Sequence, residues 1–319
     1  MTQARSPHTD FVFVYGALRS GTTVFRLMLD HHLLIANPGE LDFLFDYLSE
    51  DPAAPTGWRY DLEQLLLNRI FLSRNLTIPA GLNGLDLLAE FLRQIAASCG
   101  AKPVMTLNVH RHVDRILKIF PKARLLHMLR DPRDVARSSI QMGWAGTLYS
   151  GVHHWIETET DWDAGTAGID PAQVFTLRYE DLFTDTEGRL RAVCDFLGVP
   201  WDAGMLDYHR NSSYPPPDPT LIKQWRRKCT ARDVALLEGK AGTLMEARGY
   251  ERNGDPMFPG RQLRLELLAE DRRFIWSFRM KRYGIALLLA EKLLRHSGPK
   301  ALHRKLKLQM NRIDTLHLR

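Results

Sequence analysis

The chain has 319 residues, of which 45% are hydrophobic and 25% are charged, as is ordinary for a soluble globular protein. The longest purely apolar run, GIALLLA at 284–290, is far too short to span a bilayer, and the first ten residues lack the apolar stretch of a signal peptide. The three cysteines are widely spaced and follow no metal-binding pattern, which favours a reducing compartment. We therefore expect a cytoplasmic protein.

The net charge of +6 is unevenly distributed along the chain. Residues 255–319 contain 15 Lys and Arg against 6 Asp and Glu, whereas residues 1–254 contain 28 against 31. The basic character therefore belongs to the C-terminal part. We expect a main domain at 1–254 and a basic helical extension at 255–319.

Strands alternate with helices over most of the main domain. The apolar patterns predict strands at 11–15, 102–109, 123–130 and 173–179. A helical pattern follows each of these strands. The predicted helices begin near Ser20 or Gly21, cover VDRILKIFP and stop before Pro121, run from Pro132 to about Met142, and cover TEGRLRAVCDFLGV, which Gly198 ends.

This alternation predicts an α/β fold with three layers, in which a central parallel sheet has helices on both faces. Residues 39–100 contain several helical patterns separated by Pro- and Gly-rich breaks. We interpret this segment as a helical cap insertion around the site.

The first strand runs into a turn and a helix within FVFVYGALRSGTTVFRLMLDHH. Residues Gly16 to Thr23 match the phosphate-loop template G-x-x-x-x-G-K-[ST], except that Thr22 stands in place of the lysine. Backbone N–H groups at a helix N-terminus bind anions where glycine lets the chain approach closely. Ser20 and the two threonines add hydroxyl donors, and Arg19 adds a fixed charge. An ordinary turn capped by Ser20 is the alternative. The complete sequence of strand, Arg-Ser-Gly-Thr-Thr turn and helix favours an anion site.

Three motifs in the same order resemble those of the sulfotransferases that use 3′-phosphoadenosine 5′-phosphosulfate (PAPS). Arg19–Thr23, which reads Arg-Ser-Gly-Thr-Thr, resembles the family's loop for the 5′-phosphosulfate. Arg130 at the end of the third strand and Ser138 eight residues later resemble its site for the 3′-phosphate, and Tyr179 in LRYEDL resembles its Tyr-Glu-Asp-Leu segment. The resemblance runs from about Phe11 to Trp201 and, more faintly, to Tyr250.

The resemblance implies a P-loop-like fold and an in-line, metal-independent transfer of a sulfonate group. The donor would be PAPS, and the acceptor a hydroxyl-bearing carbohydrate, lipid or small metabolite. In nucleoside triphosphatases the lysine and Mg²⁺ neutralise the β- and γ-phosphates. A phosphosulfate has one phosphate and one sulfonate, which accounts for the missing lysine.

The resemblance also implies roles for the donor-site residues. Arg19, with Thr22 and Thr23, is expected to stabilise the leaving phosphate, while Ser20 and Gly21 complete the loop. Arg130 and Ser138 are expected to hold the 3′-phosphate. The alternative for Arg130 is a salt bridge with Asp131 or Asp134, in which case Arg133 or Arg137 would take part of its role.

A general base is expected, because the acceptor must lose a proton during transfer. Glu40 stands where glutamate-type members of the family, such as the tyrosylprotein sulfotransferases, place their base. His110 and His112 follow the second strand, near the histidine of other members. The family's Lys-x-His or Lys-x-Pro signature is not cleanly present there, since Thr106 and Leu107 stand where a lysine is expected. We favour Glu40 over His110; a carboxylate that only stabilises a helix start is the alternative for Glu40.

The stretch SSYPPPDP at 212–219 predicts a stiff linker or lid. Members of the family often close on the nucleotide just after such a segment with basic residues and an aromatic one. Lys223 and Trp225 are therefore expected to contact the adenosine bisphosphate, with a solvated basic helix start as the alternative. Four other tryptophans are candidates for the acceptor pocket or for the core, namely Trp58, Trp144, Trp155 and Trp162.

Residues 260–319 combine arginines with Phe274, Trp276 and a leucine-rich stretch. Three interpretations remain: helices packed on the main domain, a homo-oligomer contact, or an amphipathic helix at an anionic membrane surface. We recognise no nucleic-acid motif and expect no nucleic-acid partner.

Two other functions remain open at this level. A nucleoside or small-metabolite kinase would share the P-loop-like fold, and Asp131, just past a strand, is its candidate Mg²⁺ ligand. A non-catalytic nucleotide-binding protein is the alternative from another class.

Overall fold

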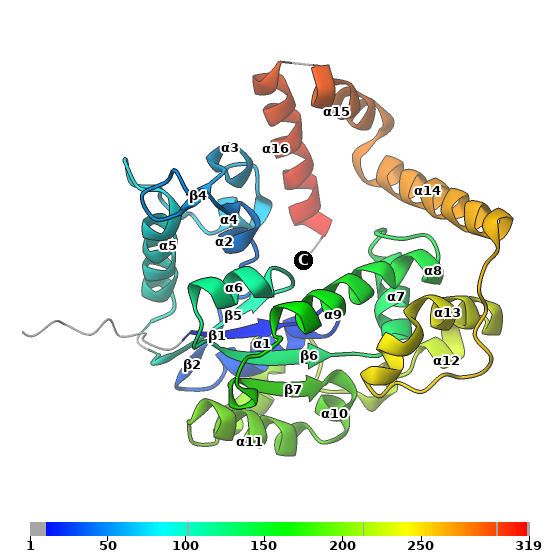
Figure 1. Ribbon diagram of the computed structural model, residues 1–319, viewed down its shortest axis with the longest axis horizontal. Helices are drawn as coiled ribbons and strands as arrows, with labels where there is room; N and C mark the ends of the chain where they lie inside the picture. The colour runs from blue at the N-terminus through cyan, green and yellow to red at the C-terminus, as the bar shows by residue number, and fades with distance from the viewer. Residues whose placement is uncertain (1–10, 101, 213, 298, 318–319) are drawn as a thin grey trace, which may run out of the picture.

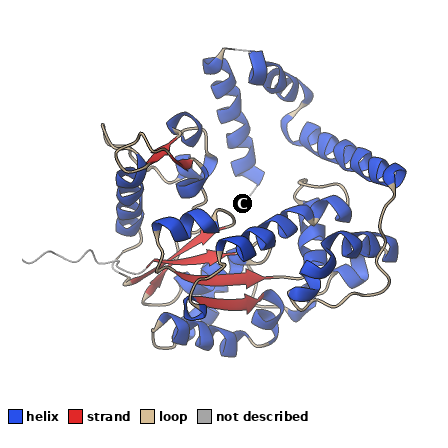
Figure 2. Cartoon of the chain, viewed as in Figure 1, coloured by secondary structure: helices blue, strands red, loops and turns tan. Residues whose placement is uncertain are grey.

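The computed structural model describes residues 11–100, 102–212, 214–297 and 299–317. A parallel sheet of five strands in the order β2-β5-β1-β6-β7 forms the middle layer, with helices on both faces (Figures 1 and 2). Its strands are β1 (Phe11–Tyr15), β2 (Ile35–Ala36), β5 (Val104–Val109), β6 (Arg124–Leu129) and β7 (Val174–Arg178). The predicted three-layer α/β fold is confirmed. Four of these strands were predicted, and the two-residue edge strand β2 was not.

Successive side chains of a strand point into two different cores, because a pleated strand directs them to opposite faces of the sheet. Phe13 and Tyr15 of β1 pack in the core that contains the cap, whereas Val12 and Val14 pack in the core on the other face of the sheet. All four side chains are fully buried. The main-domain helices that complete these layers are α1 (Thr22–Asp30), α6 (Val113–Ile119), α7 (Pro132–Gln141), α8 (Leu148–Gly151), α9 (His153–Gly165), α10 (Tyr179–Thr184), α11 (Thr186–Leu197), α12 (Trp225–Lys228) and α13 (Ala231–Ala247).

The segment at 39–100 forms a separate layer over one face of the sheet (Figure 1). It contains the predicted helices and also an antiparallel hairpin that was not predicted. Its elements are α2 (Phe43–Asp46), β3 (Leu48–Glu50), β4 (Trp58–Tyr60), α3 (Leu62–Leu65), α4 (Arg69–Ser73) and α5 (Gly84–Ser98). Edge-to-face aromatic contacts join these short elements, for example Phe71 with Phe43 and Phe91.

The basic extension forms three helices, α14 (Arg261–Tyr283), α15 (Ile285–Ser297) and α16 (Lys300–His317). Gly284, with φ 79° and ψ 151°, ends α14, so the regular helical pattern of this region is broken in two. Leu267 of α14 is buried against Tyr149 and Leu236 of the main domain. α16 runs back toward the cap, where Asn311 donates to the carbonyl of Leu67 at 2.9 Å (Figure 1).

Among the described residues, no helix is long and apolar enough to cross a membrane. Residues 1–10, which we assigned to the main domain and found without a signal-peptide pattern, lie outside the described residues.

A buried ion cluster joins α7 to α13. Arg133 lies between Asp131 and Glu238, with N–O distances of 2.8 and 2.7 Å, and all three side chains are at most 5% exposed. Replacing Arg133 with Ala would leave two buried carboxylates without their cation, so we expect the free energy of unfolding to fall by about 3–5 kcal/mol. Urea denaturation measures this change.

The matched control is Arg191→Ala, since Arg191 forms an exposed pair with Glu187 on α11. It should change the free energy of unfolding by less than about 1 kcal/mol. Equal effects of the two substitutions would contradict a stabilising role for the buried cluster.

Candidate active site

The loop between β1 and α1 can take its course only because two of its residues lack a Cβ. A Cβ on Gly16 would lie 2.4 Å from the carbonyl oxygen of Met128, and one on Gly21, at φ 93°, would lie 2.2 Å from the Tyr179 ring. Gly21 is the N-cap of α1, and no described side chain caps the helix. The first backbone N–H groups of α1 are therefore available to an anion.

Two arginines and a serine from distant parts of the chain meet at this loop. Arg19 has φ 74°, a left-handed conformation that is uncommon for residues other than glycine. Its Nε donates to Ser138 Oγ at 2.9 Å, and its carbonyl accepts from Arg130 Nη1 at 2.9 Å. The Arg130 guanidinium carbon lies 4.0 Å from the centre of the Tyr179 ring. The two predicted parts of the donor site thus form one cluster.

The charges and polar atoms of this cluster are incompletely satisfied. Within the described chain, neither Arg19 nor Arg130 forms an ion pair with a carboxylate, and Ser20 Oγ and Arg130 Nε are buried without a hydrogen-bond partner. Burial lowers the pKa of Arg19, and the neighbouring charge of Arg130 lowers it further. Buried polar groups are nearly always paired, so this arrangement indicates an anionic ligand.

A cavity of about 180 Å³ opens beside the cluster. Predicted site residues that line it are Arg19, Gly21, Thr22, Thr23, Glu40, Arg130 and Tyr179. Trp144 and the proline segment at 214–221 form other parts of its wall. Most of the predicted site therefore meets at one cavity, at the carboxyl ends of β1 and β6.

Glu40 reaches this cavity from the start of the cap. It forms a parallel bridge with Asn108 of β5, and the next backbone N–H, of Leu41, donates to the Asn108 carbonyl at 2.9 Å. Its carboxylate forms no ion pair or hydrogen bond with another described side chain. Glu40 is therefore a partly exposed carboxylate at the cavity wall.

His110 is placed differently from Glu40. It is 3% exposed, does not line the cavity, and both of its ring nitrogens have partners. Nδ1 lies 2.8 Å from Asp42 Oδ2, and Nε2 lies 3.3 Å from Thr22 Oγ1. The other carboxylate oxygen of Asp42 accepts the His110 backbone N–H at 2.7 Å. His110 thus links the cap to the threonine of the loop and is not available to an acceptor in this arrangement.

The family model described as "Sulfotransferase family" matches residues 11–203, more than half of the chain. The chain belongs to the sulfotransferase family. The match contains the loop, Arg130, Ser138 and Tyr179, so the family resemblance drawn from these motifs is confirmed.

Three relatives are similar to this sulfotransferase over part of their length. The omega-hydroxy-beta-dihydromenaquinone-9 sulfotransferase Stf3 of Mycobacterium tuberculosis is 26% identical over 43% of this chain and 38% of its own length. Protein-tyrosine sulfotransferase A of Caenorhabditis elegans is 23% identical over 63% of this chain and 53% of its own length. An uncharacterized protein of Aquifex aeolicus is 25% identical over 68% of this chain and 29% of its own length. The matches span less than two thirds of each relative.

Two solved sulfotransferase domains share the fold. The domain from the Synechococcus PCC 7002 olefin synthase has a TM-score of 0.56 at 20% identity and covers 78% of this chain and 98% of that domain. The domain from the curacin biosynthetic pathway has a TM-score of 0.54 at 16% identity and covers 76% and 98%. The predicted P-loop-like fold is confirmed.

Lys223 and Trp225 do not reach the cavity of this sulfotransferase. Trp225 is 2% exposed; its indole N–H donates to Asp131 at 2.9 Å, and Arg133 stacks on its ring at 3.9 Å. Lys223 is exposed and has a left-handed φ of 51°. In this arrangement Asp131 holds the indole of Trp225 away from the cavity, and the nucleotide contacts of Lys223 and Trp225 stay predictions.

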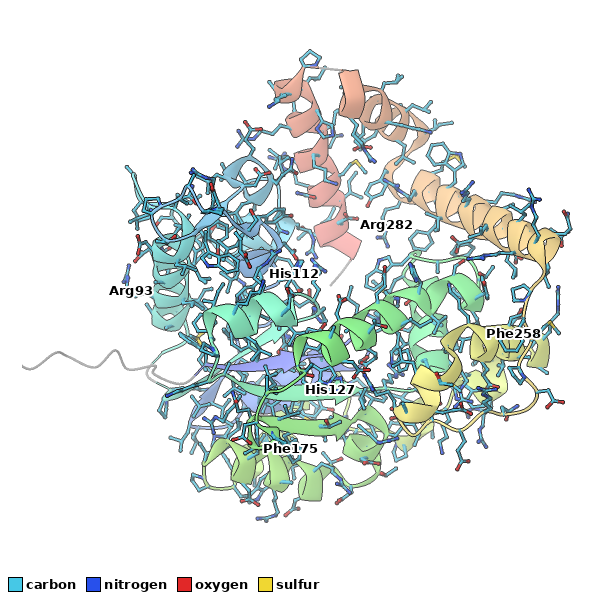
Figure 3. The ribbon with its side chains drawn as sticks, viewed as in Figure 1. Arg93, His112, His127, Phe175, Phe258 and Arg282 are labelled. Atoms are coloured by element: carbon cyan, nitrogen blue, oxygen red, sulfur yellow. The ribbon has the colours of Figure 1, made fainter. Side chains whose placement is uncertain are left out.

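The other tryptophans divide between the site and the core. Trp144 lines the cavity and is 44% exposed. Trp155 is fully buried and donates to the carbonyl of Arg130 at 3.2 Å. Trp162 stacks on His127 of β6 with ring centres 3.9 Å apart; His127 is labelled in Figure 3. Only Trp144 among these three is placed to meet a substrate.

Asp42 is a residue beside the candidate site that sequence reasoning missed. It is 6% exposed and precedes α2, two residues after Glu40. An acidic residue just before a helical pattern was the available signal, but it is usually explained by helix capping. Only the packing of the cap against β5 brings its carboxylate to His110.

The Asp42–His110 pair predicts a pH-dependent stability. Burial alone would raise the pKa of Asp42 and lower that of His110, but the mutual charge and hydrogen bond reverse both directions. The contribution of Asp42 to the free energy of unfolding is present above its unfolded pKa of about 4. It is lost as the pH falls through the lowered pKa of the folded state. The contribution of His110 is present below about 6.5 and is lost as the pH rises through its raised folded pKa.

We therefore expect Asp42→Asn to reduce the free energy of unfolding most between about pH 4 and 6.5, and less at pH 9. Urea unfolding at pH 5 and pH 9 measures the difference. Asp51→Asn, which removes an exposed partner of Arg59, is the control and should have the same small effect at both values. A pH-independent loss in Asp42→Asn would contradict the coupling.

Proposed function

We propose that this sulfotransferase moves a sulfonate group from PAPS to a hydroxyl-bearing acceptor, in line and without a metal. The observation that carries the proposal is the pair of unneutralised arginines, Arg19 and Arg130, beside the buried, unpartnered Ser20 Oγ and Arg130 Nε. Family membership supports the same donor. The transfer would gain from groups already in position rather than from new covalent chemistry.

The donor would use the whole loop. Backbone N–H groups at the start of α1, with Thr22 and Thr23, would bind the 5′-phosphosulfate, and Arg19 would stabilise the charge on the leaving phosphate. Arg130, with Ser138 beside Arg19, would bind the 3′-phosphate. The cavity of about 180 Å³ is smaller than the roughly 300–1,000 Å³ of most small-molecule sites.

Glu40 would act as the general base. Its carboxylate is at the cavity wall without a competing partner, whereas His110 has both ring nitrogens engaged. A base at this position would take the acceptor's proton as the oxygen attacks sulfur.

The kinase alternative is less well supported than sulfonate transfer. Asp131, its candidate Mg²⁺ ligand, accepts from the Arg133 backbone and side chain through Oδ1, and from Arg133 and Trp225 through Oδ2. Both oxygens therefore have partners of their own. A non-catalytic nucleotide-binding protein remains the alternative if turnover is absent.

The acceptor is proposed only as a class. The named substrates of two relatives, a hydroxylated menaquinone and protein tyrosine, both present a hydroxyl group. A carbohydrate, a lipid or a small metabolite with such a group would fit a cavity walled by Trp144 and the proline segment. We also propose a cytoplasmic location, because Cys99, Cys194 and Cys229 are all free thiols, as in a reducing compartment.

Arg130→Ala tests the donor. Calorimetric titration with 3′-phosphoadenosine 5′-phosphate, 5′-AMP and Mg-ATP should show tight binding of the bisphosphate alone. The variant should bind the bisphosphate about 10- to 150-fold more weakly, because a charge-assisted hydrogen bond contributes about 1.5–3 kcal/mol.

Arg178→Ala is the control, because Arg178 also ends a strand but stacks on Tyr250 at 5.0 Å and does not line the cavity. Preference of the wild type for Mg-ATP, or indifference to the 3′-phosphate, would favour the kinase.

Glu40→Gln tests the base. Turnover should fall by about 10²- to 10⁴-fold while the affinity for the bisphosphate is kept, because the amide cannot accept a proton. The change is measured by sulfonate transfer to a panel of hydroxyl acceptors. Glu50→Gln, at an exposed site of the same cap, should leave turnover unchanged. Near-normal turnover in Glu40→Gln would instead point to His110.

A further inference from the structure

The α14–α15 region has one face packed on the protein and another turned to solvent. On the inner side, Phe274 and Phe278 lie against Gly146 and Gly143, and Asp271 accepts the Gly146 backbone N–H at 2.7 Å. Figure 1 shows the two helices at the periphery, farther from the sheet than α8 and α9.

The outer face carries exposed apolar side chains from both helices. Trp276 of α14 is 40% exposed, and Ile285 and Leu289 of α15, four residues apart, are 60% and 44% exposed. Lys292 Nζ lies 5.6 Å from the centre of the Trp276 ring, so the two helices present these side chains on one side. We call this surface the outer face of α14–α15.

The same face is strongly basic. Residues 272–295 contain seven Lys and Arg and a single acidic residue, Glu291, which is buried and bound by Arg295 and His303. Arg282, labelled in Figure 3, pairs with Asp314 of α16 at 3.5 Å. The cations that form no ion pair with a described carboxylate are Arg272, Arg273, Arg279, Lys281 and Lys292. Three of them line a shallow apolar hollow together with Ile275 and Trp276.

We propose that the outer face of α14–α15 binds the anionic surface of a lipid bilayer. Apolar side chains and a tryptophan flanked by cations are the combination that enters the boundary between headgroups and acyl chains. Each lysine or arginine near such a surface is attracted by anionic headgroups. A second copy is a poorer occupant, because a two-fold contact through this face would place like charges opposite one another.

Helix α14 lies between the outer face and the candidate active site. The inner side of α14 supports the loop at 143–147, and Trp144 of this loop lines the cavity. A bilayer bound to the outer face would therefore meet the helix that supports one wall of the cavity. The binding itself does not depend on the proposed sulfonate transfer.

Flotation of the full chain with vesicles tests the proposal. The protein should bind phosphatidylcholine vesicles that contain about 30% phosphatidylserine, should release as salt is raised, and should not bind pure phosphatidylcholine. Two double variants, Ile285→Glu with Leu289→Glu and Arg272→Glu with Arg273→Glu, should each lower the partition coefficient at least about tenfold.

Matched controls change the same residue types elsewhere on the surface. Leu33→Glu alters a leucine that is 78% exposed, and Arg189→Glu with Arg191→Glu reverses two exposed charges on α11. Both controls should keep wild-type binding, and circular dichroism melting checks that every variant is folded.

Absence of binding to the anionic vesicles, or an equal loss in the controls, would overturn the proposal. So would sedimentation velocity showing a dimer that the Ile285→Glu, Leu289→Glu variant dissociates without any change in vesicle binding. Titration with the adenosine bisphosphate should be unchanged in all of these variants, so failure of this proposal and failure of the proposed donor are separate results.

Discussion

The candidate site depends on Arg130, whose side chain and backbone carbonyl together connect three segments that are far apart in the chain. The guanidinium donates to the carbonyl of Arg19 in the loop and lies over the ring of Tyr179 at the start of α10, while the carbonyl of Arg130 accepts from Trp155 of α9. These contacts help hold Arg19 in a backbone conformation that residues other than glycine seldom adopt. Loop, strand and helices therefore reach their positions together, and the cluster of positive charge is organised by the fold itself.

Two arginines of the same short motif, RDPRD, have opposite surroundings. Arg133 is paired with Asp131 and Glu238 and stacks on Trp225, so its charge is compensated within the protein. Arg130, three residues earlier, meets no described carboxylate, and part of its guanidinium has no hydrogen-bond partner. The start of α7 at Pro132 lies between the two: Arg130 contacts the loop, and Arg133 contacts Glu238 of α13. The same type of side chain thus forms a buried ion cluster at Arg133 and is left without an ion pair to a described carboxylate at Arg130.

Local sequence patterns were sufficient to predict the four longer strands of the sheet and the loop after β1. Val12 to Tyr15 alternate between the two cores, and Gly16 and Gly21 stand where no Cβ fits. Features that depend on distant partners were not predictable. Asp42 meets His110 across 68 residues of sequence, and Trp225 is drawn into the core by acidic residues of α7. The hairpin β3–β4 and the strand β2 are too short to leave a periodic signal. The contacts of Asp42 and Trp225 join segments far apart in the sequence, which local patterns do not record.

The segment that the family shares ends before much of the cavity's outer wall begins. Arg19, Arg130 and Ser138 lie inside residues 11–203, whereas Tyr214 and Leu221 line the cavity from beyond it, and α14 supports the loop of Trp144 from farther still. The cavity wall is thus built from two parts of the chain: the matched segment supplies both arginines, Glu40 and Trp144, and the chain beyond residue 203 supplies the proline segment that closes the opposite side.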